Sequence, residues 1–149
     1  MYSANGTAYE ISVTNDGRLT TNATYTISDA VLINDSLLVS KDNATYVMVK
    51  QINVGYLSGT IRVAFDSRDP SGAEHWVHAQ ICVNGVAVGT ERSQNGGWYT
   101  YSEDITVSAN DFIQLYVKNT DAGYPIEVRN FQIRGTSPTL QPPYITYIP

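Results

Sequence analysis

The sequence predicts an all-β protein, an antiparallel β-sandwich of the jelly-roll type with a hairpin before it and an extended arm after it. Apolar and polar residues alternate along several runs, as in strands with one buried face. Turn-forming Gly, Pro, Asn and Asp separate these runs. No window repeats apolar residues at helical spacing. The 149 residues suffice for one domain with a sizeable core, and an immunoglobulin-like sandwich is the alternative.

Residues 1–22 are expected to form a separate arm that contains a β-hairpin. In "EISVTNDGRLTTN", the segment Asn15–Gly17 suits a three-residue loop that ends in a glycine bulge. Val13 then pairs with Leu19.

Residues 23–135 are expected to form the sandwich. The runs "TIRVAF" and "DFIQLYV" alternate strictly and are rich in β-branched and aromatic residues, which is typical of strands. The side chains predicted to share a buried face are Ile61, Val63 and Phe65 in the first run and Ile113, Leu115 and Val117 in the second.

A tight hairpin is predicted in "AQICVNGVAVGTE". Asn84-Gly85 is the preferred pair for a two-residue type I′ turn, because both positions need positive φ. The resulting register pairs Val83 with Val86, Ile81 with Val88 and Cys82 with Ala87.

The alternation in "YPIEVRNFQIRG" changes phase partway. Ile126 and Val128 share one face, whereas Phe131 and Ile133 share the other. One extra residue near Arg129–Asn130 would bring all four side chains to the same face, so we predict a β-bulge there.

Charge and composition exclude several classes of function. The net charge is −5 and no basic stripe is present to follow a phosphate backbone, which argues against nucleic-acid binding. No apolar run approaches the ~20 residues of a membrane span. The start "MYSANGTAYE" lacks the features of a signal peptide, so we expect none. Cys82 is the only cysteine, which excludes a disulfide within the chain.

No catalytic or metal-binding constellation is found in the sequence, so we expect no enzymatic activity, no metal and no cofactor. His75 and His78 point to opposite faces of a strand, and Glu74 with His78 is a weak metal pair. The acidic cluster at Asp66–Asp69 lacks the spacing of a calcium loop and suits an ordinary turn. Cys82 has no predicted base beside it.

The aromatic residues of "SQNGGWYTY" suggest a glycan contact. Trp98, Tyr99 and Tyr101 follow two glycines, and an exposed ring beside such a loop can stack on a sugar. Half-buried strand residues are the more ordinary interpretation of the same pattern.

Two stretches resemble structural proteins of tailed phages. "NGTAYEISVTNDGRLTTN" is similar to a hairpin found near the start of many such proteins. The stretch from "GTIRVAFDSR" to "VRNFQIRG" resembles jelly-roll domains of head-decoration and tail-accessory proteins. The resemblance implies a virion protein, commonly trimeric, and carries no active-site residues to this chain.

The tail, residues 136–149, is expected to be an extended arm that docks on a neighbouring subunit. Pro138, Pro142 and Pro143 favour polyproline-like backbone, which loses little entropy on binding. "YITYI" alternates, so it suits the exposed edge of another chain's sheet. A tail folded back onto its own sandwich is the alternative. The side chains expected to make the contact are Leu140, Tyr144, Ile145, Tyr147 and Ile148.

Together these observations predict a non-enzymatic capsid decoration protein that acts through contacts between subunits. Its expected partners are further copies of itself, as a trimer, and a major capsid or tail protein. Its expected location is the virion, assembled in the host cytoplasm. The alternative is a carbohydrate-binding or host-attachment module.

Overall fold

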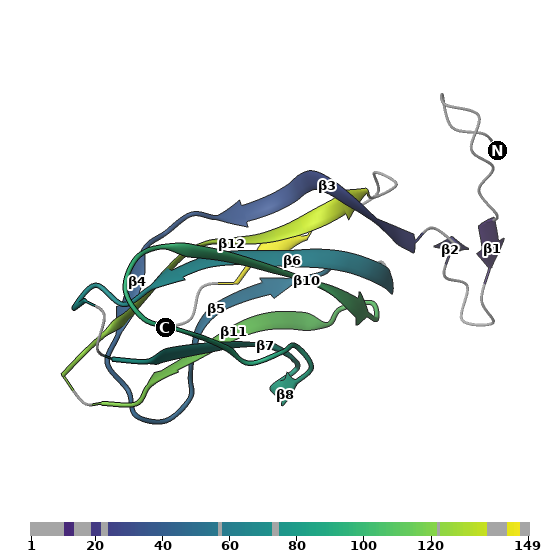
Figure 1. Cartoon of the computed structure of the whole chain (residues 1–149). Coiled ribbons are helices and arrows are strands. Elements are labelled where there is room, and N and C mark those ends of the chain that lie inside the picture. The colour runs from purple at the N-terminus through teal and green to yellow at the C-terminus, as the bar shows by residue number, and fades with distance from the viewer. Residues whose placement is uncertain are drawn as a thin grey trace.

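The computed structural model describes residues 11–13, 19–21, 24–56, 58–72, 75–121, 123–136 and 143–146. Its strands form two sheets that pack face to face, which confirms the predicted all-β, jelly-roll-like sandwich (Figure 1). No helix in these ranges is long and apolar enough to cross a bilayer.

The first sheet is organised around β12 (Ile126–Thr136). One edge of β12 pairs with β6 (Ser58–Arg68), and β10 (Tyr99–Val107) continues the sheet beyond β6. The other edge of β12 pairs with β4 (Val39–Lys41) and β3 (Thr24–Asp35).

The second sheet is organised around β11 (Phe112–Asn119), which lies between β5 (Val47–Asn53) and β7 (Val77–Val83). The far edge of β7 pairs with β8 (Val86–Ala87) and β9 (Arg92–Gln94). The far edge of β5 pairs with β13 (Tyr144–Ile145).

The N-terminal hairpin consists of β1 (Ile11–Val13) and β2 (Leu19–Thr21), which pair with each other. The predicted pairing of Val13 with Leu19 is confirmed. The predicted loop Asn15–Gly17 lies outside the described residues.

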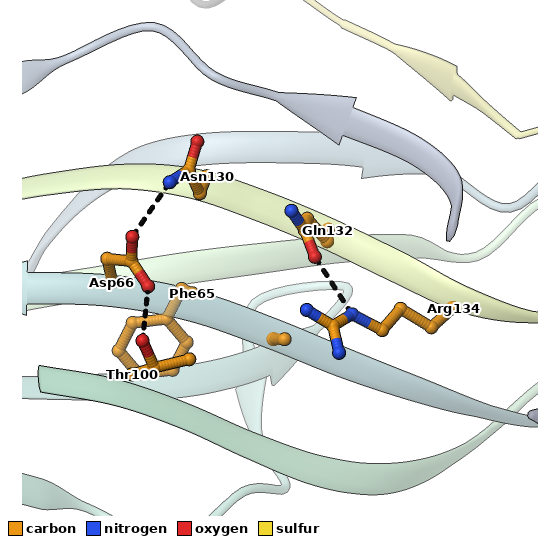
Figure 2. Close-up of a pocket in the computed structure, with 7 residues that line it drawn as sticks. Phe65, Asp66, Thr100, Asn130, Gln132 and Arg134 are labelled. Carbon is orange, nitrogen blue, oxygen red and sulfur yellow. Dashed lines mark hydrogen bonds between the residues drawn. The ribbon is translucent and has the colours of Figure 1, made fainter. Parts of the chain in front are cut away.

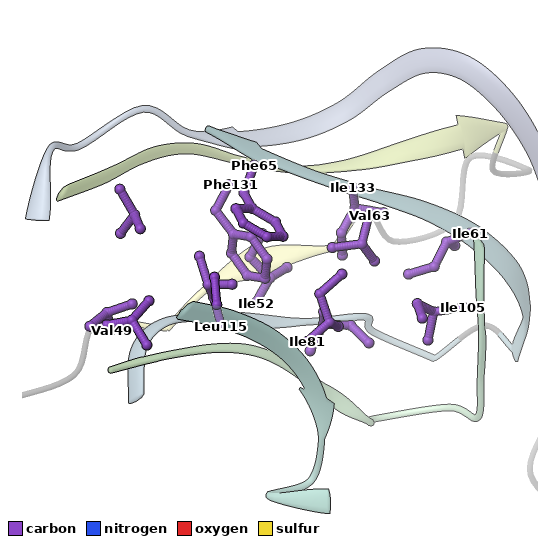
Figure 3. Close-up of a cluster of buried hydrophobic side chains, with 14 of the residues drawn as sticks. Val49, Ile52, Ile61, Val63, Phe65, Ile81, Ile105, Leu115, Phe131 and Ile133 are labelled. Atoms are coloured by element: carbon purple, nitrogen blue, oxygen red, sulfur yellow. The ribbon is translucent and has the colours of Figure 1, made fainter. Parts of the chain in front are cut away.

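The hydrophobic core lies between the two sheets (Figure 3). All the side chains predicted for the buried faces of "TIRVAF" and "DFIQLYV" are at most 1% exposed. Phe65 and Phe131 are the largest of the fully buried side chains. Burial of one such ring stabilises the fold by roughly 1.5–3 kcal/mol.

The predicted β-bulge in β12 is confirmed. Arg129 pairs with Asp66 and Gln132 pairs with Ala64, so three steps along β12 match two steps along β6. The bulge contains Asn130, whose φ of 51° lies in the left-handed region. Apolar residues on both sides of the bulge therefore reach the same core; they are Ile126, Val128, Phe131 and Ile133.

The predicted Asn84-Gly85 turn is confirmed, with φ of 51° and 81° at the two positions. Val83 pairs with Val86 and Cys82 pairs with Ala87, as expected. The predicted contact of Ile81 with Val88 forms, but Gly89 shares it. The N–H groups of both Val88 and Gly89 donate to the carbonyl of Ile81, at 3.1 and 3.0 Å, so the strand is bulged and β8 ends at Ala87.

The described part of the C-terminal tail folds back onto its own sandwich. Tyr144 pairs with Asn53 and Ile145 with Ile52, so β13 adds a strand to the edge of β5. Ile145 packs against the core. This is the alternative to an intermolecular arm. Leu140, Tyr147 and Ile148 lie outside the described residues.

Candidate functional site

A polar pocket of about 150 Å³ opens on the outer face of the first sheet, where the bulge interrupts the β6–β12 ladder (Figure 2). Phe65 of β6 faces the core, so its neighbours in the strand face outward. The residues that line the pocket are Ala64, Phe65, Asp66, Thr100, Asn130, Gln132 and Arg134. We call this the bulge pocket.

The bulge positions the amide of Asn130. Without an extra residue, strict alternation would give position 130 the opposite orientation to its neighbour Arg129. In the structure, Asn130 Nδ2 donates to Asp66 Oδ2 at 2.7 Å, and Arg129 Nε donates to the same oxygen at 3.3 Å. Two consecutive side chains of β12 therefore reach one carboxylate on β6.

Asp66 is the centre of this hydrogen-bond network. Its second oxygen, Oδ1, accepts a 2.7 Å bond from the Thr100 hydroxyl on β10 (Figure 2). Donors from two neighbouring strands thus hold the carboxylate in place, and the Arg129 guanidinium balances its charge. Because the side chains are already bound to one another, the polar wall of the pocket is preorganised.

Arg134 provides the second cation at the pocket. Its Nε donates to Gln132 Oε1 at 2.8 Å, which fixes the plane of the guanidinium (Figure 2). The other arginines in the described ranges all pair with a carboxylate; they are Arg62, Arg68, Arg92 and Arg129. Arg134 forms no ion pair with a described residue.

Trp98 lies on the same outer face, next to the pocket. The guanidinium carbons of Arg129 and Arg68 lie 4.0 and 4.8 Å from the centre of its ring. Arg68 in turn pairs with Glu127 at 2.7 Å. The indole is thus engaged by arginines and helps to position Arg129 above Asp66.

Tyr99 and Tyr101 lie on the other side of β10. They pair with the inward-facing residues Ser67 and Phe65, and their rings stack with centroids 6.4 Å apart. The Tyr101 hydroxyl donates to Gln94, whereas Tyr99 is 50% exposed at the sheet edge. The structure therefore brings two of the three predicted aromatic residues together and separates Trp98 from them.

A second aromatic surface lies in the loops at one end of the sandwich. Trp76 is 50% exposed, and the carbonyl of Trp76 accepts the N–H of Thr120 in a neighbouring loop. In the same region the His75 ring stacks on Tyr124 with centroids 3.3 Å apart, and His75 Nδ1 lies 3.2 Å from Asp121. We call this the loop-end surface.

The described residues weighed as metal ligands do not converge, and Glu74 lies outside the described residues. His75 contacts Asp121, whereas His78 contacts Glu91 at 3.1 Å. Asp66 serves the bulge pocket, whereas Asp69 is buried and caps the N–H of Ser71 in the following turn. Within the described ranges, no group of three or more His, Cys, Asp or Glu side chains is placed to hold a metal ion.

Sequence reasoning identified the bulge but not the pocket that it creates. The phase change in β12 was the available signal, because bulges often mark sites where a side chain is redirected. Thr100 and Gln132 carry no local signal, since polar residues at alternate positions of a strand are ordinary.

Comparison with known proteins shows a fold likeness without sequence similarity. The sequence matches no family model, and no curated protein sequence is similar to it. Among solved structures, the C-terminal domain of EclA, described as a sugar-binding protein, superposes with a TM-score of 0.52 at 13% identity, over 66% of this chain and 78% of that one. A family 35 carbohydrate-binding module from an environmental isolate superposes with a TM-score of 0.50 at 16% identity, over 82% and 95%. The shared feature is the β-sandwich fold.

Proposed function

We propose that this chain is a non-catalytic carbohydrate-binding module and that the bulge pocket contacts the glycan. The observation that carries the proposal is a preorganised polar pocket on an open sheet face. Sugar hydroxyls both donate and accept hydrogen bonds, so they complement a wall made of a carboxylate, two amides, a hydroxyl and a guanidinium. The fixed geometry of that wall lowers the entropy lost on binding.

Two further observations support carbohydrate binding. Tyr99, on the face of β10 opposite to Thr100, presents a half-exposed ring at the sheet edge on which a sugar can stack. The fold likeness is to proteins whose descriptions name sugar or carbohydrate binding, which favours this reading over a capsid decoration protein.

The proposal is tested with the purified chain and a panel of soluble polysaccharides in affinity electrophoresis, followed by calorimetry. Thr100→Val removes the hydroxyl that holds Asp66 and is expected to weaken binding several-fold. Thr106→Val is the matched control, because Thr106 faces outward on the same strand about 20 Å away. If both variants change the affinity equally, the glycan does not bind at the bulge pocket. Binding of no polysaccharide would refute the proposed function.

The virion location, the trimer and the capsid or tail partner stay predictions of the sequence. Light scattering of the purified chain tests the trimer, and co-purification with intact particles tests the other two.

A further inference from the structure

We infer that the bulge pocket selects glycans that carry an anionic substituent, a carboxylate or a sulfate, and that Arg134 binds this group. The inference rests on the proposed carbohydrate binding and adds the chemical class of the ligand. It starts from a cation at the pocket that has no carboxylate partner among the described residues.

The sheet itself leaves Arg134 without a counter-ion. Its cross-strand neighbours are Arg62 on β6 and Val31 on β3, so neither side supplies a carboxylate. The two carboxylates beside Arg62 are paired with Arg62 itself, since Asp104 and Asp29 bind its guanidinium at 2.8 and 2.7 Å.

The carboxylate of the pocket is also committed elsewhere. Asp66 accepts hydrogen bonds from Thr100, Asn130 and Arg129, and Arg129 balances its charge. Since Asp66 is paired with Arg129, Arg134 is the charged group of the pocket lining that has no carboxylate partner among the described residues, on a chain whose net charge is −5. An unpaired guanidinium of this kind favours an anionic ligand at this place on an otherwise acidic protein.

The chemistry of Arg134 suits an oxyanion. Gln132 occupies Nε and holds the guanidinium plane, which leaves the two terminal nitrogens to donate. Two N–H donors in one plane match the two oxygens of a carboxylate, or two oxygens of a sulfate, better than they match a single hydroxyl. The pocket of about 150 Å³ is smaller than the roughly 300–1,000 Å³ of pockets that enclose a whole ligand, so it suits one substituent of a sugar chain.

The test compares three polymers: polygalacturonate, the same polymer after full methyl esterification, and a sulfated galactan. The variants are Arg134→Gln and, as a matched control, Lys41→Gln. Lys41 is exposed on β4, lies outside the pocket and also forms no described ion pair, so both changes remove one unpaired positive charge. Arg134→Lys keeps the charge and removes the planar pair of donors.

The unchanged protein is expected to bind polygalacturonate or the sulfated galactan at least about tenfold more tightly than the ester, with affinity that falls as salt rises. Arg134→Gln should abolish this preference for the acidic polymers, and Arg134→Lys should retain only part of it. Lys41→Gln should keep the preference of the unchanged protein. Thermal unfolding checks that each variant is folded. If Arg134→Gln loses affinity for the sulfated galactan alone, the substituent is a sulfate. If it loses affinity for polygalacturonate alone, the substituent is a carboxylate.

Two outcomes would overturn the inference. If the protein binds the ester or other neutral polysaccharides as tightly as the acidic polymers, or if Arg134→Gln and Lys41→Gln behave alike, the inference fails and carbohydrate binding stands. If neither acidic nor neutral polysaccharides bind, carbohydrate binding fails with it.

Discussion

Asn130 donates a hydrogen bond to Asp66 across 2.7 Å from a backbone conformation that a regular strand does not offer. Its φ of 51° belongs to the left-handed region, which costs a residue with a side chain about 1–2 kcal/mol. The bulge thus couples a strained backbone position to the polar wall of the pocket, an association typical of functional positions.

Two replacements of Asn130 distinguish the contribution of its backbone conformation from that of its side-chain amide. Asn130→Gly removes the amide and suits the left-handed conformation, whereas Asn130→Ala removes the amide and keeps the conformational cost. We expect both variants to weaken glycan binding, and the Ala variant to unfold about 1 kcal/mol more easily than the Gly variant. Urea unfolding measures the difference. Equal stability of the two variants would show that the left-handed backbone is not needed at this position.

The buried ion pair between Lys50 and Asp35 is expected to be sensitive to loss of its acidic partner. Lys50 is 2% exposed, and its ammonium donates to Asp35 at 2.8 Å and to the Leu37 carbonyl at 2.6 Å. Asp35→Asn removes the counter-ion and leaves the buried ammonium with neutral partners only, so we expect the free energy of unfolding to fall by about 3 kcal/mol. Lys50→Met should cost less, because the Asp35 carboxylate that it leaves is more exposed than Lys50, at 13% against 2%, and still accepts the N–H of Leu37.

Asp104→Asn is the control for that experiment, since it makes the same change in the exposed pair with Arg62. It should leave the urea midpoint nearly unchanged. A similar loss in both variants would indicate that burial does not distinguish the two pairs.

Tyr25 is expected to make the fold sensitive to alkaline pH. Burial raises the pKa of Tyr25 to about 12, and its hydroxyl donates to the Val54 carbonyl in the core. In the unfolded chain the phenol ionises near pH 10. The stabilisation from its burial is therefore complete below about pH 10 and is lost as the pH rises towards about 12.

Unfolding measured between about pH 9 and about pH 12 is expected to show this loss of stability. The ultraviolet absorbance of phenolate follows the ionisation of tyrosine in the same samples. Tyr25→Phe should remove part of the pH dependence, whereas Tyr56→Phe should not, because Tyr56 is 61% exposed. An unchanged pH profile in Tyr25→Phe would contradict the prediction.

Cys82 is expected to react slowly while the protein is folded. Cys82 is 5% exposed, and burial raises the pKa of its thiol, so the thiolate that attacks electrophiles is scarce at neutral pH. Labelling with iodoacetamide at pH 8 should be slow in buffer and fast in concentrated urea. Rapid labelling of the folded protein would show that β7 opens locally or that the thiol is accessible.

Local sequence was sufficient to predict most of the sandwich. Alternation predicted the inward faces of β6 and β11, and the Asn84-Gly85 pair predicted its turn, because both depend on residues adjacent in the chain. The bulge was also predicted, since Phe131 and Ile133 reach the core only if one residue is added. Even so, the partner strands of β12 were not predicted, because many pairings satisfy the same alternation.

The candidate site was not predicted, because its residues meet only in the folded sheet. Asp66, Thr100 and Asn130 come from β6, β10 and β12, and each is an ordinary polar residue within its own strand. Their convergence follows from the register of three strands, which is set by the packing of the core. The predicted aromatic group was divided by the same register, which turns Tyr99 of β10 to one side of the sheet, whereas Trp98, just before β10, packs against Arg129 on the outer face.

By itself, the sequence determined the strand character, the inward faces, the tight turn and the bulge, because these follow from the steric preferences and alternation of neighbouring residues. Only the tertiary structure decided which segments pair with the edges of the sheets and which groups the outward-facing side chains contact. The alternating segment at the tail would suit any open sheet edge, and Tyr144–Ile145 pairs with β5 of its own chain. Arg134 would suit any carboxylate, and the described fold gives it none. The physical reason is that such contacts depend on long-range packing, which brings together segments whose local patterns do not specify one another.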